Sequence, residues 1–371
     1  MKKAKAITLF MCGDVMTGRG IDQVLPHPSN PIIYEPFVKS AKEYVELAET
    51  VSGPIPKSAD FSYIWGDTLD ELQRAAPDLR IINLETAVTK SDEYWDKGIN
   101  YRMHPENIPC LTAAKIDFCS LANNHILDWG YSGLVETLET LREANIKSAG
   151  AGRNLQEAEA QVTMEAKGKG RVIVFSYGSE TSGIPSSWAA IKDKPGVNLL
   201  ENLSNRTVHH IKEKVSEVKE GGHIVVASIH WGNNWGYAIP RDQTNFAHQL
   251  IDDAGVDVIH GHSSHHVKGI EVYKEKLILY GSGDFLNDYE GISGYEAFRN
   301  DLGLMYFAGV DPSTGKLIQL QMTPTHVKRF RVNRASKKDV LWLRDVLNRE
   351  GKRFGTQAKL NEDDTLTLGW M

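Results

Sequence analysis

Short apolar segments that each end in a polar cluster recur along this chain, and this pattern limits the folds that the chain can adopt. Apolar runs of this length are typical of buried strands. Helical stripes separate several of them, as at Leu134, Leu138 and Leu141, which keep an i, i+4, i+7 spacing. Strands that alternate with helices predict an α/β fold with a largely parallel sheet. The six segments are Ile7–Met11, Leu79–Ile82, Phe118–Ala122, Arg171–Phe175, Ile224–Ile229 and Leu277–Tyr280.

The polar residues that follow these strands are candidates for one shared site. In a parallel α/β sheet, ligands gather at the carboxyl ends of the strands. Carboxylate, amide and imidazole side chains lie at these ends, and such oxygen and nitrogen donors bind divalent metals. A mixed set of about six donors is too large for one tetrahedral zinc and suits two divalent ions with a carboxylate between them. The predicted metal ligands are Asp14, Glu85, Asn124, His230, His262 and His265.

The stretch Asp257–His266 is rich in potential ligands. Its apolar start, Val256 to Ile259, predicts the end of a buried strand, which we expect to break at Gly261. Four histidines lie within seven residues around that break. Neutral imidazole is the commonest protein ligand for transition metals, so the pattern favours a metal site over a solvated, His-rich turn. The sequence leaves the ion open among Mn, Fe, Zn, Mg and Ca.

His125 has a different predicted role. If Asn124 binds metal, the next side chain points elsewhere and can face the substrate as a general acid or base. Asp128 lies three residues further on and is predicted to orient this imidazole. The alternative is that Asp128 caps a helix that begins near Tyr131.

Aromatic and basic side chains lie in the loops next to these positions. They predict a pocket for a peptide or a similar substrate, with Arg19 or Arg102 holding a carboxylate through two hydrogen bonds. His104 and Trp235 belong to the same predicted binding surface. The alternative is a rim whose side chains only pack against one another.

Composition excludes several classes of protein. With 41% hydrophobic and 24% charged residues the chain has the composition of an ordinary globular protein. A net charge of −6 and the lack of a long basic block argue against nucleic-acid binding. No apolar run approaches the ~20 residues of a membrane span, and the first ten residues are too weakly apolar for a signal peptide, so we expect a cytoplasmic protein without a membrane anchor. Three cysteines without CxxC spacing support neither a disulfide framework nor a zinc–thiolate site.

Two regions depart from the alternation of strands and helices. Residues 22–75 are rich in proline, carry an expected helix at 34–48, and are interpreted as a lid-like insertion folded over the site. Residues 326–371 hold a basic helix at 337–349 and a polar tail. We therefore expect one domain over 1–325 and a helical extension over 326–371 that packs on it.

An ordered set of motifs carries a family resemblance. The motifs are Gly13–Met16, Asn83–Glu85, Ala122–His125, His230–Gly232, Gly261–His265 and Gly281–Phe285. Together they resemble the CapA family of poly-γ-glutamate capsule-synthesis proteins, which is similar to a branch of the calcineurin-like metallophosphoesterases. The resemblance covers roughly residues 7–310 and implies a four-layer fold, in which helices flank two packed mixed sheets. It also implies a two-metal site built from the six predicted ligands, with His125 as the catalytic histidine.

The motifs also depart from the general phosphoesterase pattern. Met16 replaces the histidine of an Asp-x-His motif, Glu85 replaces an aspartate, and two serines rather than one residue separate His262 from His265. Three hypotheses follow. The chain is a metal-dependent hydrolase of a peptide, poly-γ-glutamate or phosphoester, a metal-dependent peptide epimerase similar to lasso-peptide epimerases, or a non-catalytic accessory protein of capsule synthesis.

Overall fold

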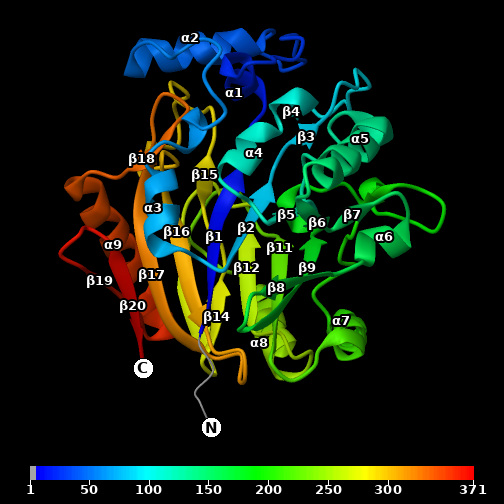
Figure 1. The fold of residues 1–371 in the computed structure, drawn as a ribbon, viewed down its shortest axis with the longest axis vertical. Coiled ribbons are helices and arrows are strands. Elements are labelled where there is room, and N and C mark those ends of the chain that lie inside the picture. Colours follow the sequence, from blue (N-terminus) through cyan, green and yellow to red (C-terminus); the bar gives the residue numbers. More distant parts are fainter. Residues whose placement is uncertain (1–5) are drawn as a thin grey trace.

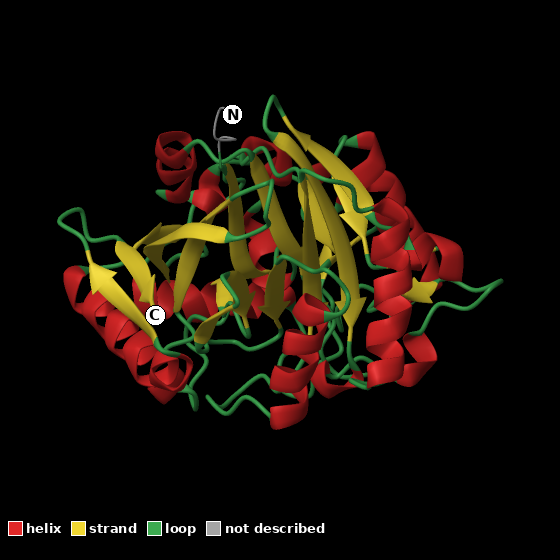
Figure 2. Cartoon of the chain, turned by 90° about the horizontal axis from the view of Figure 1, so that it is seen from below, coloured by secondary structure: helices red, strands yellow, loops and turns green. Residues whose placement is uncertain are grey.

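Two large mixed β-sheets with helices on their outer sides form the body of the protein in a computed structural model that describes residues 6–371 (Figures 1 and 2). The expected α/β class is confirmed at this level. Residues 1–5 lie outside the described part, and the expectation that the chain begins without a signal peptide falls partly on them.

The larger sheet combines a parallel and an antiparallel half. Its order is β19-β20-β17-β16-β1-β2-β5-β6, with β15 paired to β1 and β18 paired to β17. The strands β1, β2, β5, β6 and β15 run parallel, and the others join through antiparallel pairs. The bounds are β1 Ile7–Val15, β2 Leu79–Leu84, β5 Phe118–Ser120, β6 Lys147–Ala149, β15 Asp284–Leu286, β16 Leu302–Val310, β17 Leu317–Val327, β18 Val332–Arg334, β19 Thr356–Leu360 and β20 Leu366–Trp370.

The second sheet has the order β13-β14-β12-β11-β9-β8. Its four inner strands are parallel and its two edge strands are antiparallel. The bounds are β8 Val162–Ala166, β9 Gly170–Gly178, β11 His223–His230, β12 Val258–His262, β13 Ile270–Tyr273 and β14 Lys276–Leu279. Two small ribbons complete the strands: β3 Ala87–Val88 with β4 Arg102–Met103, and β7 Ala151–Gly152 with β10 Gly196–Val197.

Three apolar clusters hold these layers together. One joins side chains of both sheets, for example Leu9 and Tyr306 of the larger sheet with Val226 of the second. Another joins the other face of the larger sheet to the helices around it, and the third joins the second sheet to α7 and α8. The helices are α1 Arg19–Val24, α2 Ala41–Ser52, α3 Thr68–Ala75, α4 Pro109–Ala113, α5 Gly130–Glu143, α6 Leu155–Glu159, α7 Asn205–Val218, α8 Arg241–Asp252 and α9 Lys337–Gly351. No helix in the described range 6–371 has the length and apolarity needed to cross a membrane.

The structure corrects three expectations about local elements. Strand β12 does not break at Gly261 but continues to His262, because its pairing with β11 extends through both residues. Gly261 lies so close to the backbone of Leu279 and Tyr280 that a Cβ would not fit there. The helix expected at 34–48 is α2 and begins only at Ala41, where Ser40 and Glu43 form a capping box. The segment after α9 was expected to be a polar tail but contains two strands. Strands β19 and β20 form a hairpin, and β20 pairs with β17 as part of the larger sheet.

Part of the segment 22–75 lies beyond the strand ends, whereas α3 lies alongside the larger sheet. Figure 1 shows α1 and α2 at the end of the molecule toward which β1 runs. Its side chains are part of the apolar cluster on the outer face of the larger sheet, including Val24, Tyr44, Ile64 and Trp65. The segment is therefore packed onto the body rather than detached from it.

Candidate metal centre

Two Gly-Asp dipeptides meet at the centre of the candidate site. Strands β1 and β15 are parallel neighbours, and Asp14 and Asp284 are register partners in them. The Asp14 N–H donates to the Gly283 carbonyl at 3.0 Å. A Cβ on Gly13 would lie 1.7 Å from that carbonyl oxygen, so only glycine allows the two strand ends to approach this closely. The local sequence thus places two carboxylates side by side.

Two histidines from the second sheet face these carboxylates. His230 ends β11, His262 ends β12, and the two are register partners whose Nδ1 atoms lie 2.8 Å apart. The Ser228 hydroxyl lies 3.0 Å from Nε2 of His262. Burial lowers the pKa of both imidazoles well below the usual value. Both are therefore neutral at pH 7, which is the form that binds metal.

Three buried carboxylates complete the cluster. Asp14, Glu85 and Asp284 offer oxygens that all lie within 4.8 Å of one another. Burial, together with the neighbouring Asp284 carboxylate, raises the pKa of Asp14 to about 7. Burial and the charges of Asp14 and Asp284 raise the pKa of Glu85 well above its usual value. Asn83 donates a hydrogen bond of 2.8 Å to Asp14 and fixes its orientation.

The chemistry of this donor set fits divalent cations. Asp14 also forms a second group with His230 and His262, again with all ligand atoms within 4.8 Å. Among residues 6–371, no lysine or arginine forms an ion pair with Asp14, Glu85 or Asp284. Buried like charges repel one another strongly unless a cation lies between them. Oxygen and imidazole donors in this arrangement fit metals that accept mixed O/N ligands.

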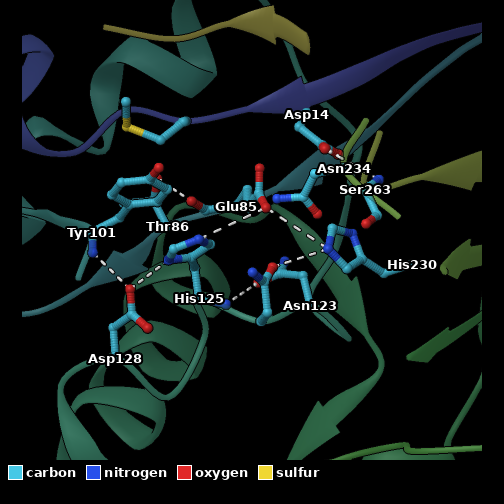
Figure 3. A network of polar contacts seen from close by, with 12 residues as sticks. Asp14, Glu85, Thr86, Tyr101, Asn123, His125, Asp128, His230, Asn234 and Ser263 are labelled. Atoms are coloured by element: carbon cyan, nitrogen blue, oxygen red, sulfur yellow. Dashed lines mark hydrogen bonds and ion pairs between the residues drawn. The ribbon is translucent and has the colours of Figure 1, made fainter. Parts of the chain in front are cut away.

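His125 and Asp128 form a second unit next to the cluster. Figure 3 shows His125 between Asp128 and Glu85, and Glu85 between His125 and His230. Nδ1 of His125 lies 2.6 Å from Asp128 Oδ2, and Nε2 lies 3.9 Å from Glu85 Oε1. Burial lowers the pKa of His125 to about 4, although the Asp128 charge opposes this shift. Asp128 makes no capping hydrogen bond to α5, and its carboxylate contacts the imidazole instead.

Tyr101 and Lys97 hold this unit in place. The Tyr101 ring stacks on the His125 ring with centroids 3.8 Å apart and an interplanar angle of 19°. The Tyr101 backbone N–H donates to Asp128 at 2.6 Å, and Lys97 forms an ion pair of 2.7 Å with the other Asp128 oxygen. Neither Tyr101 nor Lys97 was predicted from the sequence as a partner of His125. No spacing rule connects either residue to His125.

A cavity of about 570 Å³ opens beside the cluster. Its wall combines groups from the site with aromatic side chains from the surrounding loops. Trp235 stacks on Tyr295 with centroids 3.9 Å apart and closes one side. The lining residues include Arg19, Tyr44, Lys97, Tyr101, Asn124, His125, Asn234, Trp235, His265, Tyr289, Ile292 and Tyr295.

The predicted substrate-binding residues separate into two pairs. Arg19 and Trp235 line the cavity, but the Arg19 guanidinium is already held by Asp288 and by Glu35 at 2.9 Å. Arg102 does not line the cavity, because its guanidinium stacks on a tryptophan and pairs with Asp92 at 2.9 Å. His104 does not line it either, since its imidazole accepts the Glu106 N–H at 3.2 Å. The structure therefore corrects the expectation for Arg102 and His104.

Most of the predicted ligands lie together in the two groups, but His265 does not, and Asp284 belongs to a group instead. Asp14, Glu85, His230 and His262 belong to the two groups, and Asn124 places its Oδ1 at 3.0 Å from His230 Nε2. His265 lies outside both groups. Its Nδ1 is 2.9 Å from Asp284, and the left-handed turn at Ser263 directs it there. Burial lowers the pKa of His265, but the charge and the hydrogen bond of Asp284, together with the Asp14 charge, raise it above its usual value.

Asp284 was missed in the sequence as a ligand. It follows Gly283 in the same way that Asp14 follows Gly13, and both dipeptides come after an apolar strand. The similarity of these two dipeptides was the feature of the sequence that could have identified Asp284 as a ligand. The register between the two strands could not be read from the sequence, because their pairing joins residues 270 positions apart.

Because His260 is buried, we expect the free energy of unfolding to fall in acid. Its Nε2 lies 2.7 Å from the Cys12 carbonyl oxygen, and burial lowers its pKa to about 4. Because the unfolded value is about 6.5, the unfolded chain takes up a proton that the folded chain refuses as the pH falls from 6.5 to 4. We expect His260 to lower the free energy of unfolding by about 2 kcal/mol between pH 8 and pH 5.

Urea unfolding of chelator-treated protein at both pH values measures this loss. His260→Gln should show a smaller difference between pH 8 and pH 5 than the wild type does. His209, whose side chain is 70% exposed, provides the control, and His209→Gln should leave the difference unchanged. An equal acid loss in the wild type and His260→Gln would contradict the assignment.

Comparisons with known proteins identify the family to which this chain is related. Residues 8–289 match the model of the family described as bacterial capsule synthesis protein PGA_cap. A "probable polyglutamine synthesis accessory protein" of Mycobacterium tuberculosis (strain ATCC 25618 / H37Rv) is 47% identical over 364 residues, which cover 98% of this chain and 96% of that protein. The "PGA biosynthesis protein CapA" of Bacillus subtilis (strain 168) is 28% identical over 278 residues, which cover 74% of this chain and 62% of that protein. These matches show that the chain belongs to the CapA family of capsule synthesis proteins.

Proposed function

We propose that the chain is a metal-dependent hydrolase with a dinuclear site that acts on a peptide-like, carboxylate-bearing substrate. The observation that carries the proposal is that Asp14 belongs to two overlapping ligand groups, one completed by two histidines and the other by two carboxylates. A shared carboxylate between two divalent ions is the arrangement that two-metal hydrolases use. The three apolar clusters also fit the four-layer fold of calcineurin-like metallophosphoesterases.

The residues that would hold the two ions follow from the two groups. Asp14, His230 and His262 would bind one ion, and Asp14, Glu85 and Asp284 the other, with Asn124 at the edge beside His230. When bound, such ions supply Lewis-acid polarisation of a carbonyl or phosphoryl oxygen and a source of hydroxide at neutral pH.

The protein's own groups would manage the proton. With Nδ1 donating to Asp128, the other nitrogen of His125 carries the lone pair and points to the Glu85 side of the cavity. A neutral imidazole in this tautomer accepts a proton at Nε2 and returns it to the leaving group. Asp128 fixes the tautomer and stabilises the imidazolium that forms in between. Tyr101 covers one face of the ring and keeps it from turning away.

The substrate class rests on the cavity and on the relatives. Aromatic side chains, amides and few uncommitted charges line the cavity, which fits a peptide backbone better than a compact, highly charged phosphate. The relatives are named for polyglutamine synthesis and for PGA biosynthesis. A glutamate chain with amide linkages is therefore the first substrate to try.

The experiment combines metal analysis with an activity assay. Protein reloaded separately with Mn, Fe, Zn, Mg or Ca should retain close to two ions per chain, and at least one form should cleave poly-γ-glutamate or another amide substrate. The assay is run in heavy water, so that deuterium uptake at a substrate Cα without cleavage would indicate epimerisation and not hydrolysis. A protein that retains less than one ion per chain and turns over none of the substrates would be the non-catalytic accessory protein.

The stack of Tyr101 on His125 gives a prediction within this proposal. Tyr101→Leu removes the ring and frees the imidazole to move by about an ångström, which lowers kcat by about a hundredfold. Tyr101→Phe keeps the ring and loses only the hydroxyl contact of 2.7 Å to Tyr289, so it should stay close to the wild type. Steady-state kinetics at saturating metal measure both variants. Equal losses in the two variants would mean that the hydroxyl, not the stacked ring, is what matters.

A further inference from the structure

Residues 326–338 form a strongly basic segment in an acidic protein. They carry six lysine or arginine side chains and no carboxylate, whereas the net charge of the whole chain is −6. The segment starts in β17, passes through β18 and ends in the first turn of α9. Its cationic residues are Lys328, Arg329, Arg331, Arg334, Lys337 and Lys338.

Four of these side chains line one groove, called the basic groove below. The groove has a volume of about 570 Å³, and no aspartate or glutamate is among its lining residues. Lys328 and Arg329 are exposed and form no ion pair with any residue in the described range. The lining consists of Pro54, Pro56, Tyr63, His326, Lys328, Arg329, Arg331, Asn333, Arg334 and Ser336.

The other two cations of the basic groove are only partly compensated. Arg331 pairs with Asp67 at 3.2 Å, with both side chains more than 40% exposed. Arg334 pairs with the buried Glu71 at 2.9 Å. The exposed pair of Arg331 with Asp67 is weak and exchanges readily with other anions. Because Lys328 and Arg329 have no ion pair within residues 6–371, the lining of the groove remains positively charged.

The backbone holds these charges in an unusual turn. Arg329 and Phe330 are the central residues of the turn between β17 and β18, and both have positive φ, 58° and 54°. Turns of this kind favour glycine and asparagine, so the structure around them must hold these two residues in place. Glu290 does this by accepting both backbone N–H groups at 2.8 Å. Lys328 and Arg329 are thus presented at a fixed tip.

The same Glu290 connects the basic groove to the cavity. Tyr289 and Ile292 line the cavity, and Glu290 between them binds the turn of the groove and the Ser52 hydroxyl at 2.6 Å. Residues 289–292 and the end of α2 therefore link the wall of the cavity to the turn that carries Lys328 and Arg329.

We propose that the basic groove is an exosite for an acidic, carboxylate-bearing chain whose neighbouring units occupy the cavity. The inference deepens the proposed function and rests on it for the link to the cavity. Several weak contacts along one polymer add up, because each further contact forms within the same complex. A positive groove on an otherwise negative protein also directs a polyanion to this wall. Arginine donors match carboxylates in a bidentate geometry.

Nucleic acid fits the basic groove less well than a carboxylate chain does. Single-stranded nucleic acids bind where bases stack on exposed aromatic rings. Tyr63 is the aromatic residue of the groove, and its hydroxyl donates to the Arg329 carbonyl at 2.8 Å, which fixes the ring as part of the turn.

The experiment measures binding, so that it is independent of catalysis. Fluorescence anisotropy follows labelled polyglutamate, with uncharged polyglutamine and oligothymidine of the same length as comparison probes, using protein treated with chelator. Lys328→Glu combined with Arg329→Glu should weaken polyglutamate binding by about tenfold or more, and added salt should weaken binding to the wild type. Lys328→Glu alone, at a residue without an ion pair, should give a smaller loss in the same direction and serves if the double variant unfolds.

Lys212→Glu on the exposed side of α7 changes the net charge by the same amount as Lys328→Glu and should leave the affinity unchanged. Unchanged binding by the groove variants would overturn the exosite, as would equal binding of polyglutamine. Tighter binding of oligothymidine would overturn the assignment to a carboxylate chain. Polyglutamate binding without any turnover would leave the exosite standing and count against the proposed hydrolase alone.

Discussion

Asp14→Asn should lower turnover by about a thousandfold and, at the same time, stabilise the metal-free protein. The first effect follows because Asp14 belongs to both ligand groups, so the substitution weakens both. Metal ions contribute several kcal/mol of transition-state stabilisation, and each 1.36 kcal/mol corresponds to a factor of ten. Metal content per chain, measured after dialysis, should fall in parallel with turnover.

The second effect follows from the raised pKa of Asp14. Its pKa is about 7 in the folded protein without metal and about 3.8 when unfolded, so ionised Asp14 destabilises the fold increasingly as the pH rises from 3.8 to 7. Asparagine carries no charge and removes this cost, while it loses the Ser263 N–H contact of 3.2 Å. We expect a net gain of about 2 kcal/mol in the free energy of unfolding at pH 8 with chelator present.

A second buried aspartate provides the matched control. Asp257 is as buried as Asp14 but accepts from Lys219 at 2.8 Å and from Lys276. Asp257→Asn removes a paired charge and should destabilise the fold without changing metal content. Urea unfolding distinguishes the two variants by the sign of the change. If Asp14→Asn destabilises the metal-free protein as Asp257→Asn does, the result would contradict the inference that repulsion among the three carboxylates destabilises the fold.

The parts of this site that the sequence predicts are those fixed by local rules. Apolar runs identify the strands, and the carboxyl ends of parallel strands meet at one edge of a sheet. The proximity of Asp14, Glu85, His230 and His262 could therefore be predicted from the sequence. Asp128 could be assigned to His125 because it lies three positions further along the chain. Both inferences use only neighbouring positions and strand direction.

The parts that the sequence does not predict depend on register and on tertiary contacts. Asp284 becomes a partner of Asp14 only through the pairing of β15 with β1. The direction of His265 follows from one left-handed residue, Ser263. Arg102 has the right chemistry for a substrate carboxylate, but contacts with Trp129 and Asp92 use it elsewhere.

The two strands after α9, β19 and β20, were not predicted from the sequence for a similar reason. The alternating pattern of Leu366–Trp370 is short, and the hairpin of β19 and β20 is completed by pairing with β17 about 45 residues earlier. Its stability comes from that edge and from buried side chains such as Leu366, which lies in the cluster between the sheets. A five-residue segment carries too little local information to reveal such a partner.

His125→Gln should abolish most of the turnover while the metal stays bound. Loss of a general acid or base typically lowers the rate by about 10² to 10⁴. His125 belongs to neither ligand group, and its Nε2 is 3.9 Å from Glu85, so its removal leaves all the donors in place. Metal content and kcat measured on the same sample separate the two roles.

Asp128→Asn tests the second half of this unit. It keeps the size of the side chain but removes the charge that holds Nδ1–H of His125 and the ion pair with Lys97. The imidazole then loses its preferred tautomer, and we expect kcat to fall by about 10- to 100-fold with metal content unchanged. The double variant should be no worse than His125→Gln alone, because Asp128 acts only through the histidine. Additive losses would show that Asp128 has a separate role, and metal loss in His125→Gln would make this histidine a ligand rather than the acid or base.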